Sequence, residues 1–305
     1  PGGGTDFAAR LIAAFWLDSM GGDARVKNVP GADQMLGPNS VYTEKPDGRT
    51  LGLVNFGSSL ASPTLFKAAG MKYDIGKFTY IGLIPAEPFT LAAGKNLPYN
   101  SVADLQKAEG IKFGTSSGKT GGPTLGEVLA IHLLGLKNAQ VISGWDSSPE
   151  VSLAIGRGEV QAMVMPAGTI NEEVRKGFLK PIVNISFSRF ALMPDVPAIS
   201  EVVKLTPENE RLLTLYASAF NSDKTVIGTP GIPEDRVKFL REGFLKMVKL
   251  AGFQQHWKAR NVVWETPLSG EKVVEAVQKV LQVSESDLAK LNELTFPPMA
   301  GGGPN

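Results

Sequence analysis

The chain lacks cysteine altogether and has only two histidines, His132 and His256, among its 305 residues. Without cysteine there are no disulfides, no thiolate nucleophiles and no zinc sites of the cysteine type. Neither histidine has a carboxylate or a second histidine at ligand spacing. We expect His132, in the apolar helical stretch "TLGEVLAIHLLG", to be partly buried and hydrogen-bonded, and His256 to lie at the surface. A histidine-based triad, a metal site and a cofactor are therefore not expected.

Excess charge and long apolar runs are also missing. The sequence has 31 Lys and Arg against 30 Asp and Glu, with no basic stripe interleaved with aromatic residues. A nucleic-acid groove is therefore not expected. A membrane-spanning helix needs a run of about 18 apolar residues, and the sequence has no such run. The 43% hydrophobic content and the length favour a sizeable core divided between two lobes.

Short runs rich in β-branched and apolar residues alternate with helical patterns along the chain. The runs are mostly continuous rather than alternating, as is typical of strands covered on both faces. The alternation predicts an α/β fold with mainly parallel sheets. We predict strands over 50–54, 79–84, 89–93, 111–114, 139–143, 160–165 and 181–185. We predict helices over 5–20, 102–109, 123–135 and 148–156, with two more beginning at Pro233 and near Ser269.

Two segments, 92–101 and 216–233, have the composition of connections between lobes. Two crossings make the first lobe discontinuous. We predict that residues 1–97 and 221–296 form lobe 1 and that residues 98–220 form lobe 2. The Pro- and Gly-rich segment 297–305 is predicted to be a disordered tail.

The stretch "KFGTSSGKTGGPT", residues 112–124, ends like a phosphate-binding loop. That motif requires glycine, four residues, and then Gly-Lys-Ser/Thr. Here only three residues separate Gly114 from Gly118, and no apolar strand ends in an aspartate that would hold Mg²⁺. A nucleotide-binding enzyme that uses Gly118-Lys119-Thr120 is therefore the alternative interpretation.

This loop can still bind an anion although its phosphate-binding motif is incomplete. A strand, a glycine-rich turn and a helix with Pro123 in its first turn direct backbone amides and the positive helix end toward an anion. The segment "PGGGTDFAAR" at the start of the chain and "NFGSSLASP" over 55–63 repeat the arrangement. A carboxylate suits such turns as well as a phosphate does. Since such a turn normally follows a strand, we also infer that the numbered chain begins after a missing first strand and any signal peptide.

The motifs "PGGGTDFAAR", "NVPGADQMLG" and "KPDGRTLGLVN", in that order, resemble the periplasmic solute-binding proteins of tripartite tricarboxylate transporters, the Bug family. The family pattern reads PGGxxD-x-x-AR, N-x-PGAGGxxG and PDGYTL. The blocks "GRGEVQAMV" and "LMPDVPAISE" are similar to the family as well, and the resemblance covers most of residues 1–240.

The resemblance implies a two-lobe periplasmic-binding-protein-like (type II) fold with a ligand cleft between the lobes, export to the periplasm, and delivery of a small mono- or dicarboxylate to the permease subunits of a transporter. It implies a receptor that is not an enzyme, consistent with the missing catalytic sets. The ligand would be held by residues of three turns. These are Gly3, Gly4, Thr5 and Asp6 in the first, Gly57, Ser58 and Ser59 in the second, and Ser116, Ser117, Gly118 and Thr120 in the third.

The chain departs from the family pattern in three places. PGAGG reads "PGADQ", the His-Leu pair of the third turn reads Thr124-Leu125, and the PYKG block is replaced by "ISGWDSS" over 142–148. Trp145 is therefore a further candidate for ligand contact, and a core or rim aromatic is the equally supported alternative. The negative charge of Asp6 is expected to stabilise the N-terminus of the helix, and its carboxylate is expected to pair with Arg10. Lys119 is expected to be solvated.

Overall fold

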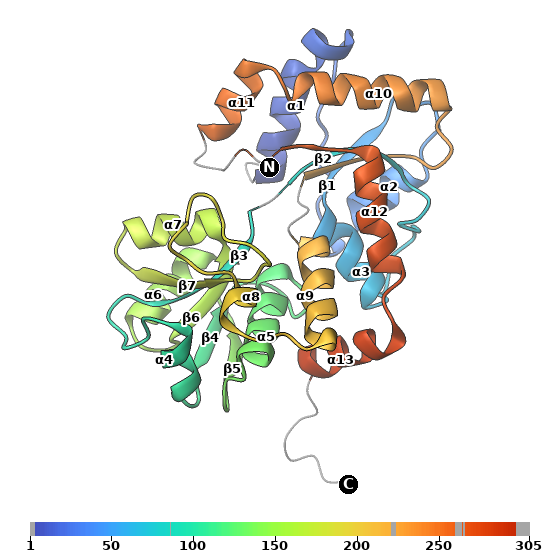
Figure 1. The fold of residues 1–305 in the computed structure, drawn as a ribbon. Helices are drawn as coiled ribbons and strands as arrows, with labels where there is room; N and C mark the ends of the chain where they lie inside the picture. Colours follow the sequence, from blue (N-terminus) through green and yellow to red (C-terminus); the bar gives the residue numbers. More distant parts are fainter. Residues whose placement is uncertain (1–3, 86, 221–223, 260–263, 265, 297–305) are drawn as a thin grey trace. The chain divides into compact units, whose positions relative to one another are not determined.

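A computed structural model of the chain describes residues 4–85, 87–220, 224–259, 264 and 266–296, and its elements fall into two units (Figure 1). The first unit contains Pro1–Glu87 and Ser218–Gln282, and the second contains Pro88–Ala217 and Val283–Asn305. These boundaries differ from the lobes predicted from the sequence, because residues 88–97 and 283–296 belong to the second unit and residues 218–220 belong to the first. The predicted tail, 297–305, lies outside the described residues.

The first unit is built on a four-stranded sheet in the order β1-β8-β2-β9. Its strands are β1 (Leu51–Asn55), β2 (Thr79–Ile84), β8 (Lys224–Gly228) and β9 (Leu268–Ser269). Its helices are α1 (Gly4–Met20), α2 (Leu36–Tyr42), α3 (Ser62–Leu65), α10 (Glu234–Met247), α11 (Ala251–Lys258) and α12 (Gly270–Leu281), with a 3₁₀ turn η1 (Ala32–Gln34) and a π-helical turn η2 (Gly57–Ala61).

The second unit is built on a five-stranded sheet in the order β5-β4-β6-β3-β7. Its strands are β3 (Phe89–Gly94), β4 (Lys112–Thr115), β5 (Gln140–Ser143), β6 (Ala162–Pro166) and β7 (Leu179–Asn184). Its helices are α4 (Val102–Lys107), α5 (Gly122–Leu134), α6 (Ser148–Gly156), α7 (Ala167–Arg175), α8 (Ile199–Val202) and α13 (Glu285–Thr295), while α9 (Pro207–Phe220) extends across the boundary at residue 217.

The prediction of mainly parallel sheets is wrong. In the first sheet β8 runs antiparallel to both of its neighbours, β1 and β2. In the second sheet β4 is parallel to β5 and β6, but β3 is antiparallel to β6 and β7. The reversed strands β3 and β8 are those that follow the first two of the three passages of the chain from one unit to the other. A strand inserted in this way need not follow the direction of a repeating strand–helix–strand unit.

The helices form where apolar residues recur at helical spacing, as predicted. On α10 the residues Leu240, Phe244 and Met247 are buried, and on α12 the residues Val273, Val277 and Val280 are buried. α1 contributes Ala8, Leu11 and Ile12 to the core that contains these α10 residues and also Phe253 and Trp257 of α11. α1 and α10 pack on each other and against the sheet (Figure 1).

The helix start predicted from the Ser101–Asp104 pair is confirmed. Ser101 accepts a hydrogen bond from the backbone amide of Asp104, and its hydroxyl donates to the Asp104 carboxylate at 2.9 Å, which fixes the start of α4. The Asp104 carboxylate also accepts from the Asn100 amide at 2.9 Å, and the bonds to the carboxylate from Asn100, first, and from Ser101 lower the pKa of Asp104. His132 is half-buried and 2.9 Å from Asn209 Oδ1, while His256 is exposed, as expected.

Candidate functional site

The first predicted turn lies at the N-terminus of α1. Gly4 is exposed at the first position of the helix, and Gly3 lies outside the described residues. The Thr5 hydroxyl donates to Asn55 Oδ1 at 3.1 Å. The expected pairing of Asp6 with Arg10 is confirmed by contacts of 3.1 Å from both Nε and Nη2. The Asp6 carboxylate therefore pairs with Arg10 and lies in the first turn of α1, where a negative charge is favourable.

The second predicted turn begins where β1 ends and forms η2. A Cβ atom on Gly57 would lie 2.5 Å from Phe220 Cδ1 and 2.9 Å from the Ala219 carbonyl oxygen, so only glycine fits there. The carbonyl of the buried Ser59 accepts a hydrogen bond from the Tyr73 hydroxyl. The Ser58 and Ser59 hydroxyls both donate to Gln34 Oε1 at 3.3 Å. This turn is thus fixed by packing and hydrogen bonds, with two hydroxyls directed at one oxygen atom.

Asn55 links the two turns of the first unit. Its Oδ1 accepts from Lys224 Nζ at 2.8 Å and from the Thr5 hydroxyl, and its Nδ2 donates to Gln34 Oε1 at 2.9 Å. A lysine ammonium group only donates hydrogen bonds, so the amide oxygen of Asn55 must face Lys224. The Asn55 NH₂ group therefore faces Gln34. Lys224 is buried, with 9% of its surface exposed, so this orientation is held by a largely desolvated positive charge.

Three donors thus converge on one point, where Gln34 Oε1 lies in this structure. We call the three donors Asn55 Nδ2, Ser58 Oγ and Ser59 Oγ the first-unit oxygen site. Sequence reasoning named the two serines but missed Asn55, Gln34 and Lys224. The departure "PGADQ" was a signal for Gln34, and Lys224 stands in strand β8, which was taken for a connection.

The third predicted turn, residues 115–124, is the second-unit loop. Its hydroxyls bond one another: Ser117 Oγ lies 2.8 Å from Thr124 Oγ1, which lies 3.0 Å from Thr115 Oγ1. Ser117 Oγ also accepts from the Thr124 amide at 3.4 Å, near the start of α5. The Ser117 side chain therefore stabilises the loop itself, which the sequence pattern did not reveal.

Other residues of the second-unit loop are open to solvent. Ser116 and Thr120 are half-buried, and Gly118 is exposed with no atom within 4 Å of where its Cβ would be. Lys119 is exposed as expected, and its Nζ lies 5.8 Å from the centre of the Phe296 ring. The loop therefore presents backbone around Gly118 rather than a lysine held at a phosphate position.

Trp145 follows β5 and is half-buried. Its ring lies beside the end of β4, where a Cβ on Gly114 would be 3.4 Å from Trp145 Cζ3. This position fits the interpretation of Trp145 as a rim aromatic, and a ligand contact for its exposed part stays a prediction.

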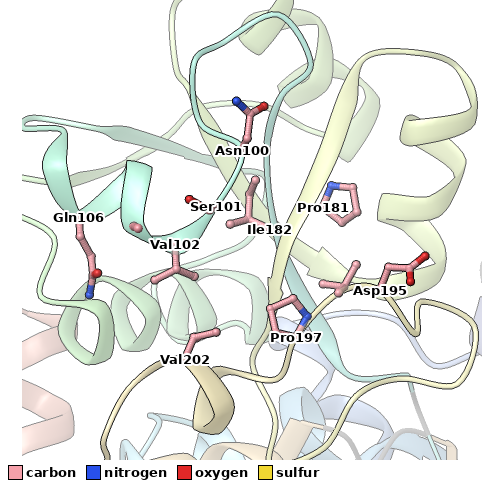
Figure 2. Close-up of a pocket in the computed structure, with 11 residues that line it drawn as sticks. Asn100, Ser101, Val102, Gln106, Pro181, Ile182, Asp195, Pro197 and Val202 are labelled. Carbon is pink, nitrogen blue, oxygen red and sulfur yellow. The ribbon is translucent and has the colours of Figure 1, made fainter.

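A cavity of about 420 Å³ lies elsewhere in the second unit (Figure 2). It is bounded by the start of α4, by β7 and by the segment that precedes and includes α8, and it contains none of the predicted site residues. Its lining comprises Asn100, Ser101, Val102, Ala103, Gln106, Pro181, Ile182, Asp195, Val196, Pro197 and Val202. Figure 2 shows mainly aliphatic and proline side chains around it, with Asp195 as the single charged residue.

Two features are absent from the described part of the chain. No group of three or more His, Cys, Asp or Glu side chains is arranged to hold a metal ion there. Within the same residues, no helix combines the length and the apolar character needed to cross a bilayer.

The family model of the tripartite tricarboxylate transporter family receptor, TctC, matches residues 8–228 of the sequence. The chain belongs to this family. The resemblance seen in the glycine motifs is thereby confirmed. Because the family is one of solute receptors, the expectation that the protein is not an enzyme is confirmed as well.

Curated relatives of this TctC-family chain include a UPF0065 protein of Bordetella bronchiseptica and the protein BugT of Bordetella pertussis. They are 26% and 25% identical over 206 and 207 residues. Each alignment covers 66% of this chain and 60% or 63% of the relative. The chain thus matches somewhat less than two thirds of the length of these relatives.

Solved structures with the same fold include a TctC solute-binding protein from Polaromonas, with 20% identity, a TM-score of 0.74 and coverage of 96% of this chain and 93% of that one. MatC from Rhodopseudomonas palustris with bound malate gives 20% identity, a TM-score of 0.65 and coverage of 97% and 95%. A second R. palustris protein, solved with adipate, gives 20% identity, a TM-score of 0.65 and coverage of 96% of this chain and 93% of that one. The predicted periplasmic-binding-protein fold is confirmed by these likenesses.

Proposed function

We propose that this TctC-family receptor binds a small organic carboxylate outside the cytoplasm and delivers it to the permease subunits of a tripartite tricarboxylate-type transporter. The observation that carries the proposal is the first-unit oxygen site, where three hydrogen-bond donors converge on a single acceptor position. A site composed of donors, with a buried lysine behind it, favours an anionic oxygen as its ligand.

The predicted ligand residues belong to two groups, one in each unit. The first group is Thr5, Gly57, Ser58 and Ser59, and Gly3, Gly4 and Asp6 are assigned to it by their place at the first turn. The second group is Ser116, Ser117, Gly118 and Thr120, with Trp145 beside the same strand end. We propose that each group supplies hydrogen-bond donors to a carboxylate, the first through side chains and the second mainly through backbone amides.

Hydrogen bonds alone can supply the affinity that a receptor of this kind needs, with no catalysed reaction. Hydrogen bonds to a charged group contribute about 1.5–3 kcal/mol each, so a few of them, less the cost of association, reach micromolar affinity, about −8 kcal/mol. Malate and adipate, the ligands named for two solved proteins of the same fold, are reasonable first probes for this chain. The alternative of a nucleotide enzyme is supported only by the letters Gly118-Lys119-Thr120.

A thermal-unfolding panel tests the proposal. Malate, succinate, adipate and acetate are compared with Mg-ATP at equal ionic strength. A ligand that binds only the folded protein raises the melting temperature by mass action, so at least one carboxylate should do so while Mg-ATP should not. Stabilisation by Mg-ATP alone would reverse the assignment. Titration calorimetry on the positive ligand then gives the dissociation constant.

Delivery and location are tested separately. The full-length gene product, fractionated from its native cells, should be recovered in the periplasmic fraction. Deletion of the gene should abolish uptake of the radiolabelled carboxylate identified in the panel. Uptake that is unaffected by the deletion would separate this receptor from that transport activity.

A further inference from the structure

Gln34 is exposed, yet its side-chain oxygen accepts three hydrogen bonds, from Asn55 Nδ2 at 2.9 Å and from the Ser58 and Ser59 hydroxyls at 3.3 Å. A surface amide oxygen has two lone pairs and is ordinarily solvated by water. Three converging protein donors are more than that oxygen requires. The arrangement is therefore explained better by the donors than by Gln34: they form an acceptor site that some oxygen has to fill.

The orientation of the two amide groups in this arrangement is determined. Lys224 can only donate, so Asn55 presents its oxygen to Lys224 and its NH₂ group to Gln34. Gln34 must then present Oε1 rather than Nε2. An oxygen is thus specified at this point whether it comes from the protein or from a ligand.

The backbone of Gln34 is unusual as well. Its φ is 72°, and Ala32 two residues earlier has a φ of 47°, both in the left-handed region that L-residues with a side chain adopt with a free-energy penalty. Glycine would adopt this backbone without that penalty. The chain therefore holds a strained residue at a position from which a long amide side chain reaches the oxygen site.

We propose that Gln34 is a specificity-determining residue whose amide oxygen takes the place of one ligand carboxylate oxygen in the first-unit oxygen site. A ligand that uses this site must displace Gln34, and because the side chain is exposed it can move into solvent. Gln34 thus lowers the affinity for acids that need the site and favours those that do not. This inference rests on the proposed function, because it assumes that the protein binds carboxylates.

The test uses two variants that empty the site in different ways. Gln34→Gly removes the side chain and suits the left-handed backbone. Gln34→Asn keeps an amide and tolerates that backbone, but it is one methylene shorter, so its oxygen does not reach the donors. Ala32→Gly is the matched control, because it relieves a positive φ in the same turn and leaves Gln34 in place.

Titration calorimetry with malate, succinate, adipate and acetate measures the outcome. Both Gln34 variants should bind at least one of these acids about tenfold more tightly than the wild type, as expected for donors that no longer need to be freed. Ala32→Gly should bind like the wild type. Thermal unfolding in the absence of acid verifies that all four proteins are folded.

The outcomes distinguish this inference from the proposed function. If the wild type binds an acid and both Gln34 variants bind all of the acids with equal or lower affinity, the inference is wrong and the proposed function stands. If only the Gln34 variants bind, the inference is supported in its strongest form. If neither the wild type nor any variant binds these acids, both ideas are overturned together.

Discussion

The Arg211 guanidinium holds the Asp287 carboxylate by two hydrogen bonds, 2.8 Å from Nε and 2.9 Å from Nη2. Asp287 lies in the first turn of α13 and is buried, with its amide capped by Ser284 Oγ at 3.0 Å. A two-point contact of this kind fixes geometry as well as contributing energy. It attaches α13 to α9, and α13 also packs against α5 of the second unit. This explains why residues 283–296 belong to that unit although the sequence assigned them to the first.

We predict that Arg211→Leu lowers the melting temperature of the second unit by several degrees at pH 7. The hydrogen bond from Arg211 is the main cause of a lowered Asp287 pKa. A carboxyl with a lowered folded pKa stabilises the protein above its unfolded pKa, about 3.9, and the stabilisation is lost as pH falls through the folded pKa. The difference between wild type and variant should therefore shrink in acid, as followed by circular dichroism melts.

Arg157→Leu is the matched control for this experiment. Arg157 and Glu159 form an exposed ion pair, with 56% and 48% of the side-chain surface accessible. Exposed pairs contribute little to stability. Equal losses in the two variants would show that the bidentate contact has no special role.

A second prediction concerns Glu127, which is fully buried in α5. Its Oε1 accepts from the Val164 amide at 3.3 Å, and its Oε2 has no hydrogen-bond partner among the described residues. Burial raises the pKa of this carboxyl well above its ordinary value, with the Val164 bond opposing the shift. The folded protein therefore retains a proton that the unfolded chain releases above about pH 4.3.

The folded state binds more protons than the unfolded state between the two pKa values, so stability falls as pH rises through that range. Glu127→Gln resembles the protonated form and should be more stable than the wild type at pH 8 by about 1–3 kcal/mol, with no advantage near pH 4. Urea unfolding at pH 4, 6 and 8 measures this, and Glu242→Gln on the exposed face of α10 is the control. A constant difference at all three pH values would contradict the assignment.

Patterns local in sequence predicted much of this fold. The apolar spacing over 233–248 placed α10 with Leu240, Phe244 and Met247 inward, and the Ser101–Asp104 pair placed the start of α4. Strand β8 was missed because it begins with Lys224, and a charged residue argues against a buried strand. Its burial depends on Asn55, which is 169 residues away. Strand direction and the docking of α13 likewise depend on contacts between distant residues.

The residues of the candidate site were likewise predicted where the signal is local in sequence and missed where it depends on distant contacts. Glycine-rich turns after strands identified Gly57, Ser58 and Ser59 because such a turn requires small residues and exposes donors. Gln34 could not be assigned to the same site, because its contacts span 21 to 25 residues and require a left-handed backbone. The hydrogen bond between Ser117 and Thr124 could not be predicted either. A serine whose hydroxyl points into its own loop cannot be told by sequence from one whose hydroxyl points toward a ligand.

A third prediction concerns Lys224. Its ammonium group orients the Asn55 amide, so Lys224→Met should leave Asn55 free to turn and should weaken binding of the carboxylate found in the thermal panel about tenfold. Lys246→Met, on the exposed side of α10, controls for the loss of one positive charge. Calorimetric titration of both variants provides the comparison. Equal affinity in the two would remove Lys224 from the binding group.

The last prediction compares two glycines in two of the predicted turns. Gly118 has open space where a side chain would lie, so Gly118→Val should fold normally and should weaken carboxylate binding at least tenfold by covering the backbone of the second-unit loop. Gly57 is enclosed by Phe220 and Ala219, so Gly57→Val should instead lower the melting temperature markedly through overpacking. Calorimetry and thermal unfolding on both proteins separate loss of binding from loss of fold. Full affinity in Gly118→Val would confine carboxylate recognition to the first unit.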